Sequence, residues 1–133
     1  FVGKASEIAG HVFVDQSSLK SMKETIEKAE AQLDKGASMV IFPEGARTKT
    51  GKMGRFKRGA FIIAKEMSLS IVPVTVNGAY DLMKIKTYLL NPGTLELIVH
   101  EPVSTEELTD ENMLDFIGDC RNTVYSGLWE KYK

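Results

Sequence analysis

The stretch from residue 38 to residue 59 reads SMVIFPEGARTKTGKMGRFKRG, and it decides how the rest of the chain is interpreted. It begins with a short apolar run, residues 39–42, which Pro43 and Gly45 interrupt. Proline and glycine straight after such a run indicate that a β-strand ends and a loop begins. Residues 47–58, called the basic loop below, contain no acid and six cations: Arg47, Lys49, Lys52, Arg55, Lys57 and Arg58. Since open α/β sheets bind anions at the carboxyl ends of their strands, the basic loop predicts a phosphate-bearing ligand.

The composition is that of one soluble globular domain. The 133 residues are 43% hydrophobic and 26% charged, with a net charge of −1. A local basic loop on a nearly neutral chain favours a small anion or a lipid headgroup over a nucleic acid. The single cysteine, Cys120, excludes an internal disulfide, and no Cys or His cluster predicts a metal site. No apolar run approaches the roughly 18 residues that a membrane-spanning helix needs.

Hydrophobic periodicity predicts alternating strands and helices. Expected strands cover residues 12–14, 39–42, 71–76 and 94–99. We expect helices from residue 17 or 18 to Gly36, over residues 58–67, and near the C-terminus after a cap at Ser104 or Thr109, with a helical turn at 80–83. The order β-α-β-α-β-β-α predicts an α/β fold with a mixed, mainly parallel sheet flanked by helices.

The residue types in FPEGART, Phe42 to Thr48, suit an anion site. Pro43 fixes its own φ, and Gly45 permits backbone angles that other residues avoid, so the chain can turn tightly beneath a ligand. The guanidinium of Arg47 matches two phosphate oxygens at once. Glu44 is an acceptor that would hold a substrate hydroxyl or orient Arg47. The alternative is a solvated surface loop with a structural Glu–Arg pair.

FPEGART and the following FKRGAF, Phe56 to Phe61, resemble two hallmark segments of the phospholipid and glycerol acyltransferase family, which includes the lysophosphatidate acyltransferases. IVPV at residues 71–74 and GHVFVDQ at residues 10–16 are similar to two further segments of that family. The resemblance covers about residues 10–78. Gln16 stands where the family usually has arginine.

The resemblance implies that residues 1–133 form a single, partial acyltransferase-like domain that lacks its N-terminal catalytic block. In the family a His-x-x-x-x-Asp block precedes the segment that GHVFVDQ resembles. Neither histidine fits this spacing, because Gln16 stands five residues after His11 and Thr105 five residues after His100. We therefore assign no catalytic residue within this chain and expect it to be inactive alone.

The implied function is transfer of a fatty acyl chain from acyl-CoA or acyl-ACP to a lysophosphatidate-type glycerophosphate acceptor in phospholipid biosynthesis. The family needs no other cofactor, and the implied location is the cytoplasmic face of a membrane, with peripheral attachment or an anchor outside this chain. The resemblance assigns substrate binding to Phe42, Pro43, Glu44, Gly45, Arg47, Lys57 and Pro73. A non-catalytic module that binds anionic lipid or phosphate is the alternative, and a plain structural domain with a solvated basic loop is the third reading.

Overall fold

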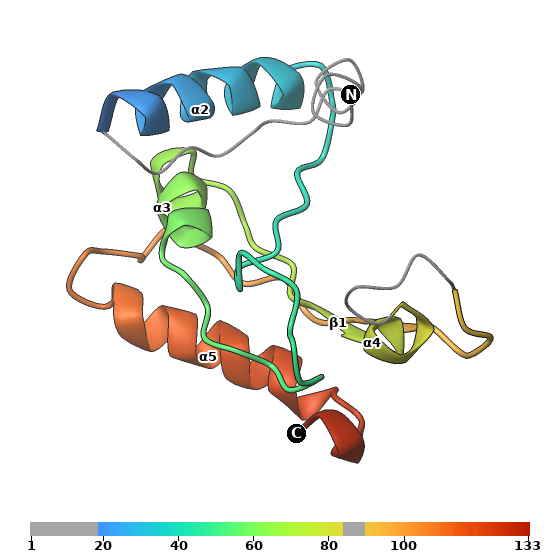
Figure 1. Cartoon of the computed structure of the whole chain (residues 1–133). Coiled ribbons are helices and arrows are strands. Elements are labelled where there is room, and N and C mark those ends of the chain that lie inside the picture. Colours follow the sequence, from blue (N-terminus) through green and yellow to red (C-terminus); the bar gives the residue numbers. More distant parts are fainter. Residues whose placement is uncertain (1–18, 84–89) are drawn as a thin grey trace. The chain divides into compact units, whose positions relative to one another are not determined.

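The computed structural model describes residues 19–83 and 90–133 (Figure 1). The chain divides into two compact units, residues 1–41 and residues 42–133. The expected strand at 12–14, together with His11 and Gln16, lies outside the described residues. That residues 1–133 form a single domain stays a prediction.

The described part of the first unit is built on helix α2, Leu19–Leu33. The predicted helix is confirmed, and so is its end at Gly36. Gly36 has φ +82°, and its N–H donates to the Leu33 carbonyl at 2.8 Å. Glycine is the usual residue at such a left-handed helix end. Ala29, on the predicted apolar stripe, is buried.

The predicted strand at residues 39–42 is wrong. These residues form no strand, and the side chains of Val40 and Phe42 are 80% and 75% exposed. Within the described part of the chain, the single backbone hydrogen bond of this run joins the Gly45 N–H to the Phe42 carbonyl. A β-prone sequence becomes a strand only when a neighbouring strand takes up its backbone groups.

The second unit contains a two-stranded antiparallel sheet of β1, Val74–Asn77, and β2, Glu96–Val99. Val74 lies opposite Val99, and Asn77 lies opposite Glu96. These strands confirm the last two predicted strands at shorter lengths. No parallel pair occurs among the described residues, because one of the two earlier strands lies outside them and the other does not form.

A glycine fixes the junction between β1 and the short helix α4, Ala79–Leu82, which confirms the predicted helical turn. Gly78 has φ +88°, and a Cβ built there would lie 1.9 Å from the carbonyl oxygen of Thr94. The chain after β1 therefore passes the residues before β2 at a distance that only glycine permits.

The core of the second unit lies between α3, Gly59–Glu66, and α5, Met113–Ser126. Its buried members are Phe61, Leu108, Met113, Ile117 and Cys120. Both helices were predicted, α3 from a continuous apolar run and α5 from its apolar spacing. Among the described helices, none is long and apolar enough to span a bilayer.

The predicted cap of the terminal helix is wrong by several residues. Asn112, rather than Ser104 or Thr109, precedes α5, and its backbone carbonyl accepts the N–H of Phe116 at 3.0 Å. The Asn112 side chain instead accepts the backbone N–H of Thr109 at 2.8 Å. The two polar residues thus bond each other in a turn before the helix, which is a common competing use of these side chains.

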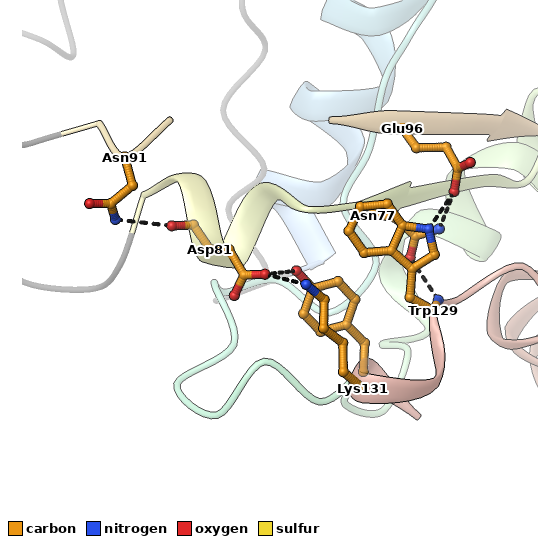
Figure 2. Close-up of polar contacts among 7 residues, drawn as sticks. Asn77, Asp81, Asn91, Glu96, Trp129 and Lys131 are labelled. Atoms are coloured by element: carbon orange, nitrogen blue, oxygen red, sulfur yellow. Dashed lines mark hydrogen bonds and ion pairs between the residues drawn. The ribbon is translucent and has the colours of Figure 1, made fainter. Parts of the chain in front are cut away.

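The chain after α5 returns to α4 through the 3-10 helix η1, Glu130–Tyr132. A carboxylate oxygen of Asp81 accepts bonds from Lys131 Nζ at 2.6 Å and from the Tyr132 hydroxyl at 2.8 Å (Figure 2). The bond to Asp81 raises the pKa of Lys131. For Tyr132, burial is the larger cause of a raised pKa, with the same carboxylate adding to it.

The buried Cys120 thiol predicts a loss of stability in alkali. Burial raises its pKa from 9.0 to about 11. Above pH 9 the unfolded chain releases this proton while the folded chain keeps it, so folding stability falls as the pH rises toward 11. We expect this one group to remove about 1 kcal/mol by pH 10. Urea denaturation at pH 8, 9 and 10 of the wild type and of Cys120→Ala measures it, because the packing that the variant also loses does not depend on pH. A stability difference between the two proteins that stays constant with pH would contradict the prediction.

Candidate functional site

The two segments FPEGART and FKRGAF lie side by side because two hydrogen bonds close the loop between them, and a third shapes the FPEGART turn itself. The Gly45 N–H donates to the Phe42 carbonyl at 2.9 Å, and the Lys57 N–H donates to the Pro43 carbonyl at 2.8 Å. A carboxylate oxygen of Glu44, Oε2, accepts the Gly54 N–H at 2.7 Å. The end of the basic loop is thereby held against the residues that precede the loop.

The Lys57 side chain packs close against Gly45, where the two segments meet. Gly45 has φ +71°, and a Cβ built on it would lie 2.8 Å from Lys57 Nζ and 3.0 Å from Lys57 Cε. Any larger residue would push the lysine side chain away, and its positive φ would add strain. The glycine therefore lets the ammonium group of Lys57 lie directly over the turn.

Arg47 is exposed and bonds outside its own motif. Its Nη2 donates to the backbone carbonyl of Met83, beside α4. Arginine has five N–H donors, so this bond fixes the side chain and leaves donors for a ligand. The expectation that Glu44 orients Arg47 is wrong, because the carboxylate bonds Gly54 and no ion pair joins the two residues.

The middle of the basic loop is shaped by Thr48. Its hydroxyl donates to the Lys52 carbonyl at 2.8 Å and accepts the Gly51 N–H at 3.1 Å. From outside the loop, the Tyr80 hydroxyl donates to the Lys49 carbonyl at 3.2 Å. The loop is therefore an ordered turn with several backbone groups bonded.

In the described part of the chain, no Asp or Glu side chain pairs with any of the six cations of the basic loop. The ion pairs found within residues 19–83 and 90–133 are Lys65–Asp110, Lys131–Asp81 and Lys133–Glu130. Concentrated positive charge without acidic partners attracts anions. The same residues contain no group of acids, histidines or cysteines that would hold a metal ion.

Phe42 and Pro73 lie differently from the basic residues. Phe42, the first residue of FPEGART, is 75% exposed. Pro73 is buried just before β1, and its carbonyl accepts the N–H of His100 at 3.0 Å. Its bond thus runs to the end of β2 rather than to the basic loop. That Phe42 and Pro73 contact substrate stays a prediction.

His100 has a structural role. Its Nε2 lies 2.8 Å from the hydroxyl of the fully buried Thr75, and that hydroxyl donates to the Val124 carbonyl at 2.7 Å. A hydroxyl has one hydrogen to donate, so Nε2 of His100 carries the hydrogen of their shared bond. The histidine joins β2, β1 and α5.

Sequence reasoning missed three residues that shape the site: Gly54, Met83 and Arg121. Gly54 bonds Glu44 through its N–H and accepts a bond from Arg121 Nε at 3.0 Å through its carbonyl. Met83 contributes only a backbone carbonyl. Backbone acceptors carry no sequence signal, and Arg121 reads as an ordinary cation on the terminal helix.

Comparison with known proteins gives this site a context. Residues 1–77, more than half of the chain, match the family model described as Acyltransferase. A chloroplastic 1-acyl-sn-glycerol-3-phosphate acyltransferase from Arabidopsis thaliana is 34% identical over 103 residues, covering 77% of this chain and 29% of the relative. A 1-acyl-sn-glycerol-3-phosphate acyltransferase from Saccharomyces cerevisiae is 30% identical, covering 98% of this chain and 44% of the relative.

A solved structure supports the same relationship. The crystal structure of PlsC, the 1-acyl-sn-glycerophosphate acyltransferase from Thermotoga maritima, superposes with a TM-score of 0.71 at 26% identity, covering 97% of this chain and 53% of PlsC. This likeness confirms the α/β, acyltransferase-like fold class. The chain spans less than half the length of the two curated relatives, at 29% and 44%. By its match over residues 1–77 and its similarity to these enzymes, the chain belongs to the acyltransferase family that FPEGART and FKRGAF resemble.

Proposed function

We propose that this chain is the acceptor-binding part of an enzyme that transfers a fatty acyl group to a 1-acylglycerol-3-phosphate. The donor is a thioester, acyl-CoA or acyl-ACP, and no other cofactor takes part. In the reaction the acceptor hydroxyl forms an ester bond with the acyl carbon, the C–S bond breaks, and the thiol leaves with the proton. The relatives are 1-acyl-sn-glycerol-3-phosphate acyltransferases, which supports this acceptor class.

The observation that carries this proposal is the pair of cations at the FPEGART turn. Lys57 Nζ lies over Gly45, Arg47 is exposed with donors to spare, and neither is paired with a carboxylate in the described part of the chain. A phosphate monoester carries close to two negative charges and three acceptor oxygens. One guanidinium and one ammonium beside a glycine turn match that charge and leave the backbone accessible to the ligand.

The proposal also places the enzyme at a membrane. A lysophosphatidate acceptor enters from a membrane, so the enzyme works at a membrane surface, on the cytoplasmic face. Attachment is peripheral or through parts outside this chain. The exposed cations of the basic loop would also attract anionic headgroups, each contributing about 1 kcal/mol near such a surface. Activation of the acceptor hydroxyl is left to a histidine block outside these residues, and this chain alone is inactive.

Arg47→Ala is expected to weaken binding of lysophosphatidate at least tenfold, since a charge-assisted hydrogen bond contributes about 1.5–3 kcal/mol. Titration calorimetry of the chain with lysophosphatidate and with the matching phosphate-free monoacylglycerol measures it. Arg55→Ala is the matched control, because it removes the same charge from the same loop at a residue outside the proposed contacts.

Phosphate-selective binding that Arg47→Ala removes and Arg55→Ala keeps would support the acceptor site. If the two variants lost equal affinity for lysophosphatidate, the loop would only attract anions in general. That result would favour a non-catalytic lipid-binding module. Equal binding of the two lipids by the wild type would contradict the proposal.

A further inference from the structure

Gly54 is the backbone residue that joins the FPEGART turn to helix α5. Its N–H donates to Glu44 Oε2 at 2.7 Å, and its carbonyl accepts Arg121 Nε at 3.0 Å. A Cβ built on Gly54 would lie 2.9 Å from Glu44 Oε2, so the carboxylate approaches as closely as a glycine allows. Glycine is the residue with the greatest freedom in φ and ψ, and bonds on both of its flanking peptide groups remove that freedom.

Arg121 is itself held in place by α5. The neighbouring Ile117 and Cys120 are buried in the core of the second unit. The guanidinium carbon of Arg121 lies 5.7 Å from the ring centroid of Tyr125, one helical turn further on. No ion pair of Arg121 occurs within the described residues. Among the described residues, the strongest polar contact of Arg121 is therefore its hydrogen bond to the basic loop. Helix α5 sets the direction in which the Arg121 side chain points.

A second contact ties the same part of the loop to the same core. Phe56, two residues after Gly54, packs against the core cluster that α5 helps to build, with its ring centroid 6.4 Å from that of Phe61. Arg121 and the core thus hold residues 54–56 from two directions. A surface arginine that happened to meet a loop carbonyl would have no such companion contact.

We propose that Arg121 is a positioning residue of the acceptor site, acting through Gly54 on Glu44. By fixing the carbonyl of Gly54, it directs the N–H of that residue at Glu44 and keeps the FPEGART turn in its binding geometry. This inference rests on the proposed function for its effect on lipid binding, but the geometric role of Arg121 is independent of it. Arg121 lies outside the region of residues 10–78 that carries the family-like segments.

The test combines amide proton exchange with lipid titration on the 133-residue chain. In Arg121→Ala we expect the Gly54 amide to exchange about tenfold faster by NMR and lysophosphatidate to bind about tenfold more weakly, since the variant removes a hydrogen bond made by a charged group. Lys65→Ala is the charge-matched control: Lys65 pairs with Asp110 at 2.8 Å, and its removal is expected to change neither reading. The double variant Glu44→Ala, Arg121→Ala is expected to bind no more weakly than Glu44→Ala alone, because residues that act through one another give non-additive effects.

The outcomes separate this inference from the proposed function. Unchanged Gly54 exchange in Arg121→Ala overturns the positioning role, whatever happens to lipid binding. Fully additive losses in the double variant also overturn it, because Arg121 would then act independently of Glu44. Faster Gly54 exchange in a chain whose wild type does not bind lysophosphatidate would instead sustain the geometric role and defeat the acceptor site.

Discussion

Replacing Phe61 by alanine is expected to lower the free energy of unfolding by about 3–5 kcal/mol. Phe61 is 3% exposed and belongs to the buried cluster with Met113 and Ile117. Its ring lies 6.4 Å from that of Phe56 and meets Phe116 edge-on at 6.2 Å. The variant would lose the apolar surface that the ring buries and both ring contacts, and it would leave a cavity between α3 and α5.

Chemical denaturation of the chain measures this loss of unfolding free energy. Helix α5 offers a residue for a matched control. Leu114 is 68% exposed on the same helix that carries Met113 and Ile117. Leu114→Ala removes a comparable apolar side chain from the surface and is expected to change stability by about 0.5 kcal/mol or less. Similar midpoints for Phe61→Ala and Leu114→Ala would mean that Phe61 is not at the centre of the core.

The same substitution links the core to the candidate site. Phe56 belongs to the basic loop, and its ring packs against the ring of Phe61 in the core. Without that support, we expect residues 54–57 to lose their fixed position beside the FPEGART turn. Phe61→Ala should therefore also weaken lysophosphatidate binding under conditions in which the variant is still folded.

Helices were predicted better than strands because a helix carries its own hydrogen-bond partners. Apolar residues at spacings of three and four specified α2 and α5, and a continuous apolar run specified α3, within a few residues of their bounds. A strand depends on a neighbour elsewhere in the chain. Residues 39–42 have the composition of a strand and form none, whereas β1 and β2 form because each pairs with the other.

The candidate site was predictable where a side chain carries its role in its own chemistry. Gly45 does adopt a positive φ, as its place in a tight turn predicts. The predicted partner of Glu44 was wrong because the carboxylate bonds a backbone N–H, and any residue except proline can provide one. For the same reason, no sequence pattern marks the bond from Arg121 to the Gly54 carbonyl.

A buried amide joins the sheet to the C-terminal segment, and its loss is expected to cost about 3 kcal/mol. Asn77 is fully buried at the end of β1 (Figure 2). Its Nδ2 donates to Glu96 Oε2 at 2.8 Å and to the Gly127 carbonyl at 2.9 Å, while its Oδ1 accepts the Trp129 N–H at 3.0 Å. Asn77→Leu keeps the size of the side chain but removes all three bonds. Buried groups left without partners cost about 1–3 kcal/mol each, and the indole of Trp129, bonded to Glu96 at 2.8 Å, keeps the carboxylate partly satisfied.

Asn91→Leu is the matched control for Asn77→Leu, because it makes the same change at an exposed position. Asn91 Nδ2 donates to the backbone carbonyl of Asp81 at 3.0 Å (Figure 2). Water replaces a lost partner at an exposed position, so we expect a change of about 0.5 kcal/mol or less. Urea denaturation followed by the fluorescence of Trp129, the single tryptophan, reads out both variants at the residue that Asn77 holds. Equal midpoints for the two variants would show that the amide of Asn77 does not hold the C-terminal segment on β1. A large loss for Asn77→Leu alone would show that η1, and with it the bonds of Lys131 and Tyr132 to Asp81, depends on one buried side chain at the end of the sheet.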